Sequence, residues 1–274
     1  MKNIKKIGIL ALVLVFAVGL LAACGGGDDS ASEDKTITVA ASPTPHAEIL
    51  NSVKDALAKD GWTLEVIEFD DYVQPNVATT DGDVDANYFQ HVPYLEQYNE
   101  ENGTDLVAVA DMHYEKMAIY SESKKSLDEL ADGDKIGVPN DATNEARALK
   151  VLAENGVIKL AEGTTETATK TDIVENPKNV EIVELEAATI PATLPDLAYG
   201  VINANYAIQS DIMDKIVAVE GTDEAQEDTY VNIIVVAKGN EESEKTQALI
   251  NALHSDECRQ FIEDTFNGAV VAKF

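Results

Sequence analysis

The segment Pro139–Arg147 carries the clearest binding chemistry in this sequence. Asn144 and Arg147 are three residues apart, on one face of a helix predicted over Ala142–Asn155. The first turn of a helix offers unpaired backbone N–H groups and the positive end of a dipole, and a guanidinium binds a carboxylate with two parallel hydrogen bonds. The segment therefore predicts a carboxylate site. The alternative is a solvated arginine paired with Glu145 or another acid.

A second group combines aromatic and imidazole side chains. Phe89, His91 and Tyr94 surround the junction between a strand predicted over Val84–Phe89 and a helix predicted over Pro93–Glu101. In α/β proteins, strand ends of this kind face the ligand crevice. Ordinary packing at the start of a helix would explain the same three residues, so the group alone does not establish a site.

Two asparagines occur where apolar residues are expected. Asn232 interrupts the apolar strand predicted over Val231–Ala237, and Asn203 follows Val201 and Ile202 in another predicted strand. An amide side chain is poorly suited to an apolar strand. Each asparagine therefore needs a hydrogen-bonding partner, which is either backbone or a ligand.

Sequence motifs of enzymes and nucleotide sites are absent. The chain has no phosphate-binding glycine loop, no G-x-G-x-x-G, no C-x-x-C, no H-E-x-x-H and no G-x-S-x-G elbow. Its four histidines are scattered along the chain, which argues against a zinc site. A stretch from Asp81 imitates a calcium loop but has Ala86 and Val92 at positions that require glycine and glutamate. The sequence predicts a binding protein without metal or cofactor rather than an enzyme.

The elements that must position these residues alternate along the chain. From Thr36 onward, short β-like runs alternate with helices of about ten to fifteen residues, in two successive blocks. This pattern is typical of α/β proteins and predicts two lobes. About 240 residues are enough for one large or two modest domains.

The first 35 residues predict export and a lipid anchor. Three lysines precede 17 residues without charge (Ile7–Ala23), the layout of a secretory signal peptide. Cys24 follows the small residues Ala22 and Ala23, which resembles the bacterial lipobox, so we assign 1–23 to a signal peptide and 24–35 to a lipidated tether. The alternatives are an uncleaved anchor, for which the run is at the short limit, or a chance cysteine after an ordinary signal.

The charge of the chain narrows the classes of partner. The formal net charge is −30, and removal of 1–23 with its three lysines makes it about −33. So acidic a surface argues against nucleic-acid binding and against docking on anionic lipid. Besides Cys24 the chain has only Cys258, so no internal disulfide is predicted, and Cys258 is expected to be a small core residue.

At its candidate binding residues the chain resembles the methionine-binding lipoproteins of ABC importers, the MetQ and NlpA family. The resemblance extends from about Lys35 to Phe274. The segments that carry it are Asp71–Asn76, Asp85–Leu95, Pro139–Arg147, Val174–Asn179, Val183–Ala187, Tyr230–Asn232 and Phe266–Gly268.

The resemblance implies an α/β, two-lobe periplasmic-binding-protein fold, type II-like, with crossing hinge strands. We place the crossings near Lys116–Ser121 and Thr229–Val235. The first lobe then comprises 36–118 and 232–274 and is discontinuous, and the second comprises 119–231.

The resemblance also implies roles for individual residues. Arg147 would pair with the ligand carboxylate with support from Asn144, and Asn203 and Asn232 would bind the amino-acid head group. The residues expected around the thioether side chain are Tyr72, Phe89, His91, Tyr94 and His113.

The implied function is the binding of L-methionine between the lobes and its delivery to a membrane permease driven by a separate ATPase. The protein would be a monomer on the extracytoplasmic face of the cell membrane, held by lipid at Cys24. D-methionine, a methionine dipeptide or another apolar amino acid are alternative ligands. An adhesion lipoprotein with a vestigial cleft is the alternative from a different class.

Overall fold

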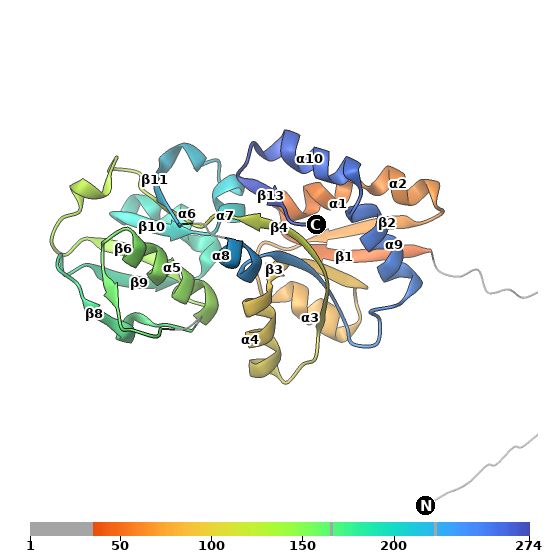
Figure 1. The fold of residues 1–274 in the computed structure, drawn as a ribbon, viewed down its shortest axis with the longest axis horizontal. Helices are drawn as coiled ribbons and strands as arrows, with labels where there is room; N and C mark the ends of the chain where they lie inside the picture. Colours follow the sequence, from red (N-terminus) through yellow and green to blue (C-terminus); the bar gives the residue numbers. More distant parts are fainter. Residues whose placement is uncertain (1–34, 165–166, 222–223) are drawn as a thin grey trace, which may run out of the picture. The chain divides into compact units, whose positions relative to one another are not determined.

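Two β-sheets covered by helices carry the part of the chain that the structure describes (Figure 1). The structure is a computed structural model that describes residues 35–164, 167–221 and 224–274. The predicted signal peptide, the candidate lipidation site Cys24 and the tether up to residue 34 lie outside the described residues. No helix in the described ranges is long and apolar enough to cross a membrane.

The first sheet has six strands and the second has five. In order across the first sheet, the strands are β13 (Val270–Ala272), β4 (Val107–Glu115), β12 (Asn232–Val236), β3 (Ala86–His91), β1 (Thr36–Ala41) and β2 (Thr63–Glu68). In order across the second, they are β11 (Ile216–Val219), β5 (Ala118–Tyr120), β10 (Tyr199–Ile202), β6 (Lys135–Pro139) and β9 (Glu181–Leu185). A separate pair is formed by β7 (Lys159–Leu160) and β8 (Ile173–Glu175).

Helices follow most of the strands. They are α1 (Glu48–Ser52), α2 (Lys54–Lys59), α3 (Gln74–Asp81), α4 (Val92–Asn102), α5 (Ala142–Glu154), α6 (Ile190–Thr193), α7 (Ala204–Gln209), α8 (Glu224–Thr229), α9 (Glu244–Leu253) and α10 (Asp256–Phe266). Short turns of helix occur at Pro43–Ala47, Leu127–Glu129, Lys170–Asp172, Ala187–Thr189, Leu194–Asp196 and Met213–Lys215.

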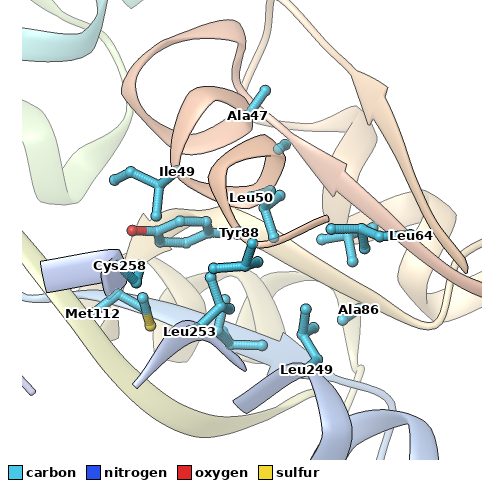
Figure 2. Packing of buried hydrophobic residues seen from close by; sticks show 14 of the residues in the cluster. Ala47, Ile49, Leu50, Leu64, Ala86, Tyr88, Met112, Leu249, Leu253 and Cys258 are labelled. Carbon is cyan, nitrogen blue, oxygen red and sulfur yellow. The ribbon is translucent and has the colours of Figure 1, made fainter. Parts of the chain in front are cut away.

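The central strand β12 shows why this sequence forms a sheet that is covered on both faces. Successive side chains of a strand point to opposite faces, and here both faces are apolar. Ile234 packs into the cluster formed with α1, α9 and α10, which Figure 2 shows around Tyr88 and Met112. Ile233 packs on the other face against Leu95 of α4. The uninterrupted apolar run in the sequence follows from burial on both sides.

The second sheet is also packed on both faces. Leu149 and Leu152 of α5 lie against Ile136 and Val201, and all four are fully buried. The opposite face is covered by the segment from Ala187 to Leu197 and by α7. Helix α5 is therefore held on the sheet by its apolar stripe, which fixes where its first turn projects.

The chain passes between the sheets twice. It leaves the first sheet after β4 at Glu115 and enters the second at Ala118, and it returns between β11 and β12. This is the α/β two-lobe arrangement with crossing segments that the sequence predicts. The first sheet therefore contains strands from both ends of the described chain, whereas the strands of the second sheet lie between them.

Some element bounds differ from those expected. Strand β3 begins at Ala86 rather than Val84, because the Asp85 carboxylate accepts a hydrogen bond from the backbone N–H of Thr38 (2.8 Å) and turns the chain at that point. The apolar run Leu106–Ala110 predicts a strand there, and β4 continues five residues beyond this run, to Glu115. Helix α7 and strand β13 were not expected from the sequence.

Candidate functional site

A cavity that is partly open to solvent lies between the two sheets. It is formed by the end of β3, the start of β12, the end of β4, and the first turns of α5 and α7. The residues that line it are His46, Tyr72, Phe89, Gln90, His91, Tyr94, Glu115, Met117, Asn144, Arg147, Asn203, Ala204, Asn205 and Asn232.

Arg147 is buried in the wall of the cavity and is bound to Glu220. Its Nε and Nη2 donate to the two Glu220 carboxylate oxygens at 3.0 and 2.5 Å, and Nη2 also donates to the backbone carbonyl of Glu115 at 2.7 Å. Burial lowers the pKa of Arg147, but Glu220 more than offsets this and raises it. The partner is therefore a buried glutamate 73 residues further along the chain, and Arg147 is not the solvated arginine that the alternative interpretation required.

Glu220 is held by several other donors. It accepts hydrogen bonds from the Tyr114 hydroxyl (2.5 Å), the backbone N–H of Met117 (2.6 Å) and the Gln226 amide (3.0 Å). The Arg147 guanidinium also lies 4.3 Å from the ring centroid of Tyr230, within cation–π range. The guanidinium is thus fixed in position at the cavity wall.

The first turn of α5 is capped by its own sequence. The Asp141 carboxylate accepts from the backbone N–H of Asn144 and from its side-chain amide, both at 2.9 Å. The expectation that this helix start offers free N–H groups to a ligand carboxylate is therefore wrong at Asn144. Its side-chain oxygen instead accepts from the Asn203 amide (2.7 Å) and lies 3.3 Å from Nε2 of His91.

Aromatic rings form another wall. Tyr72, Phe89 and Tyr94 lie with ring centroids 5.8 to 5.9 Å apart, in tilted and edge-to-face pairs. The Tyr94 hydroxyl donates to the Tyr72 backbone carbonyl at 2.9 Å, and the Tyr72 ring packs on Tyr206 of α7 with centroids 4.8 Å apart. These contacts connect the loop before α3 to the second sheet's side of the cavity.

The inner wall is polar and lies against the first sheet. The Glu115 carboxylate is 2.7 Å from Nε2 of His113 and 3.6 Å from Nε2 of His46. His46 Nε2 is also 2.9 Å from the Asn232 side-chain oxygen. Burial raises the pKa of Glu115, and burial lowers the pKa of His46 to about 4 and of His113 to about 3. Both imidazoles are therefore neutral at pH 7.

Two cavity-lining amides each have one buried atom without a partner. The Asn203 side-chain oxygen and the Asn205 side-chain nitrogen make no hydrogen bond, although both are inaccessible to solvent. The Asn205 oxygen accepts from the Tyr72 hydroxyl at 2.6 Å, which joins the two sides of the cavity. Buried polar groups without partners are costly, so the cavity presents an acceptor and a donor that a ligand could satisfy.

The structure brings eight of the nine predicted binding residues to the cavity. Tyr72, Phe89, His91, Tyr94, Asn144, Arg147, Asn203 and Asn232 line it. His113 does not; it is fully buried behind Glu115, with Nδ1 bonded to the Tyr88 hydroxyl.

Sequence reasoning missed six lining residues and the partner of Arg147. The polar ones used in the site are His46, Glu115, Asn205 and Glu220, and the others are Gln90, Met117 and Ala204. Glu115 lies two residues after His113, and Asn205 lies two residues after Asn203. In a strand, residues two apart point to the same face, so the position of His113 could have indicated Glu115. No local signal indicates Glu220.

A family model and a curated relative both match almost the whole described chain. A family model described as NlpA lipoprotein matches residues 37–274. The methionine-binding lipoprotein MetQ of Bacillus subtilis (strain 168) is 43% identical over 274 residues, which covers 97% of this chain and 98% of that protein. The matched range includes every residue of the cavity.

Solved structures of related proteins share this fold. A nutrient-binding protein from Burkholderia cenocepacia bound to methionine is 39% identical with a TM-score of 0.82, covering 87% of this chain and 100% of that one. The substrate-binding protein of a methionine transporter from Streptococcus pneumoniae is 36% identical with a TM-score of 0.82, covering 88% and 96%.

Proposed function

The chain belongs to the NlpA lipoprotein family, and from this premise we propose that it is the extracytoplasmic substrate-binding protein of an ABC importer. It binds L-methionine in the cavity between its two lobes and delivers it to a permease driven by a separate ATPase. The similarity to a protein bound to methionine and to the binding protein of a methionine transporter supports this assignment. The proposal includes no catalytic step.

The polar groups of the cavity suit the head group of a free amino acid, and this observation carries the proposal. Arg147 and the unpartnered Asn205 amide nitrogen are donors for the carboxylate. Glu115 and the unpartnered Asn203 oxygen are acceptors for the ammonium, with Asn232 beside them. A zwitterion satisfies both sets at once, which a purely anionic or apolar ligand would not do.

The aromatic wall suits the thioether. Tyr72, Phe89 and Tyr94 form a cluster of rings at the cavity, and His91 lies beside Tyr94 with ring centroids 6.3 Å apart. A sulfur near aromatic edges gains about 0.3–1.5 kcal/mol per contact. Asn144 has a supporting role, since its oxygen orients Asn203.

Ligand binding closes the two lobes, which we assign to 36–118 with 232–274 and to 119–231. Phe89, Tyr94 and Asn232 belong to one lobe, and Arg147 and Asn203 to the other. A ligand that touches both lobes stabilises the closed form. Ligand-free protein should therefore compact when methionine is added, with a smaller radius of gyration in solution scattering.

The central experiment measures binding to protein that has been unfolded, washed and refolded to remove bound ligand. L-methionine should bind in calorimetry and raise the melting temperature. N-acetyl-L-methionine, which lacks the ammonium, should bind at least tenfold more weakly. D-methionine and a methionine dipeptide test the alternative ligands. Absence of binding and of a thermal shift with all of them would contradict the transport assignment.

The lipid anchor at Cys24 completes the proposal. Acylation of this thiol would hold the monomer on the outer face of the cell membrane, near the permease. A Cys24→Ala variant should be released in soluble form or keep its signal peptide. If the variant still partitions with membranes as a cleaved protein, Cys24 is not the anchor.

An adhesion protein with a vestigial cleft is the second candidate. It predicts no selective ligand and no reason for unpartnered buried amides at Asn203 and Asn205. Mass spectrometry of the small molecules released on denaturation separates the two candidates, because only a working binding protein should release one stoichiometric amino acid.

A further inference from the structure

Three metal-ligating side chains converge behind the inner wall of the cavity. His46, His113 and Glu115 each place one ligating atom within 4.8 Å of the other two, and all three residues are buried. Nε2 of His113 and of His46 both point to the same Glu115 oxygen, at 2.7 and 3.6 Å. Two ligands of one tetrahedral zinc ion are about 3.3 Å apart, given bond lengths of about 2.0–2.2 Å. Small side-chain movements would bring the three atoms to that spacing.

The second nitrogen of each imidazole faces a group that could hold the ring in a ligating orientation. Nδ1 of His113 is bonded to the Tyr88 hydroxyl. Nδ1 of His46 makes no full hydrogen bond, but the Thr44 backbone lies near enough to favour a proton on the ring. Metal-bound histidines usually donate their other N–H to a backbone carbonyl or an oxygen of this kind. An ion would replace the contacts that the two Nε2 atoms now make, with Glu115 for His113 and with Asn232 for His46.

The cluster can be reached from the cavity and carries a carboxylate. His46 and Glu115 line the cavity, so an ion there could be reached from it and could take a further ligand from water. Arg147 is already paired with Glu220, so the Glu115 carboxylate has no dedicated cationic partner. Its neighbours are the two imidazoles, the backbone N–H of Asn205, and the Arg147 charge, which acts on it without a direct ion pair.

We propose that His46, His113 and Glu115 form a site for a divalent transition-metal ion of the Zn²⁺ type. Two imidazoles and one carboxylate with an open position are a donor set that zinc accepts. The sequence predicted no such site because His46 is far in the chain from His113 and Glu115, which share β4; the fold places His46 beside the end of β4. The ion would bind to ligand-free protein.

The ion and the amino acid compete for Glu115, and this part rests on the proposed function. One carboxylate cannot serve both the zinc ion and the ligand ammonium. Saturating L-methionine should therefore weaken zinc binding, and by linkage zinc should weaken methionine binding by the same factor. We expect at least tenfold in each direction.

The test is calorimetric titration of Zn²⁺ into stripped, chelator-treated protein. His46→Phe and His113→Phe keep an aromatic ring and remove a ligand, so each should weaken zinc binding at least tenfold. His254→Phe is the matched control, because His254 is exposed and contacts the Asp111 carbonyl outside the cavity. It should leave zinc binding unchanged. Melting temperatures show whether each variant is folded.

X-ray absorption of the zinc-loaded wild-type protein gives a readout that does not depend on variants. It should show two histidine nitrogens at about 2.0–2.1 Å. No histidine in the first shell, or equal zinc affinity in all three variants, would overturn the metal site. Methionine binding without zinc binding contradicts only the metal site, whereas zinc binding without methionine binding contradicts the proposed function.

Discussion

Glu115 and Glu220 are buried carboxylates near the same arginine, and their surroundings are opposite. Glu220 receives two hydrogen bonds from Arg147 and others from Tyr114, Met117 and Gln226. Glu115 has His113 as its close partner, and only its backbone carbonyl contacts Arg147. Glu220 is thus satisfied within the protein, whereas Glu115 faces the cavity.

Glu220 therefore has a structural role in the site, whereas Glu115 is available to contact a ligand. A buried ion pair contributes little net stability, but removal of one partner is costly because the other charge is left unpaired. A buried carboxylate without an ion-pair partner of its own destabilises the protein until a cation binds to it. Removal of the two side chains should therefore change stability in opposite directions.

The largest effect should come from Glu220→Ala. It leaves the Arg147 guanidinium buried without its counter-ion, which costs about 3–5 kcal/mol of unfolding free energy. Chemical denaturation of the stripped protein measures this. A loss below about 1 kcal/mol would mean that Glu220 is not the structural member of the pair.

The next effect should come from Arg147→Ala, measured as methionine affinity. Loss of one partner of a buried charge pair costs about 2–5 kcal/mol of binding, which is thirtyfold or more. The double variant Arg147→Met with Glu220→Gln is the control, because it removes both charges together. It should recover most of the stability and still fail to bind; a change under threefold in Arg147→Ala would refute the anchor role.

Glu115→Gln should change the stability of the protein in the opposite direction to Glu220→Ala. Methionine affinity should fall by about 1.5–3 kcal/mol, the worth of a hydrogen bond to a charged group. The melting temperature of the stripped protein should stay the same or rise, since a desolvated charge has been removed. If Glu115→Gln destabilises as strongly as Glu220→Ala, the contrast between the two carboxylates is wrong.

The smallest effect should come from Tyr72→Phe. It removes the hydrogen bond that joins Tyr72 to Asn205 across the cavity and keeps the ring packing on Tyr206. We expect a loss of about 1 kcal/mol in methionine binding, roughly fivefold. Tyr94→Phe, which removes a bond to the backbone on the same side, is the matched control and should affect binding less.

Much of the fold could be predicted because its cues are local. Strands covered on both faces read as continuous apolar runs, as in β12, and the Asp141 cap and apolar stripe of α5 lie within a few residues of each other. The same local cues identified Arg147, Asn203 and Asn232 as unusual. The first residue of a strand could not be predicted where a side chain changes the path of the backbone, as Asp85 does before β3.

The partners of the site residues could not be predicted, because they come from distant parts of the chain. Arg147 pairs with Glu220, and His46 approaches Glu115 from the short helical turn Pro43–Ala47 that follows β1. His113 was expected at the thioether on the resemblance to the family, not on its place in a strand. The longer strand turns His113 toward the interior, behind Glu115.

The strand order of the first sheet has a consequence for how the protein folds. β12 lies between β3 and β4, yet it comes from the last part of the chain, after every strand of the second sheet. Until β12 is available, β3 and β4 expose unpaired edges. We therefore expect the second lobe to fold first and the first lobe to close last. A chain that crosses a membrane from its N-terminus would thus remain unfolded in its first lobe until its C-terminal residues had emerged.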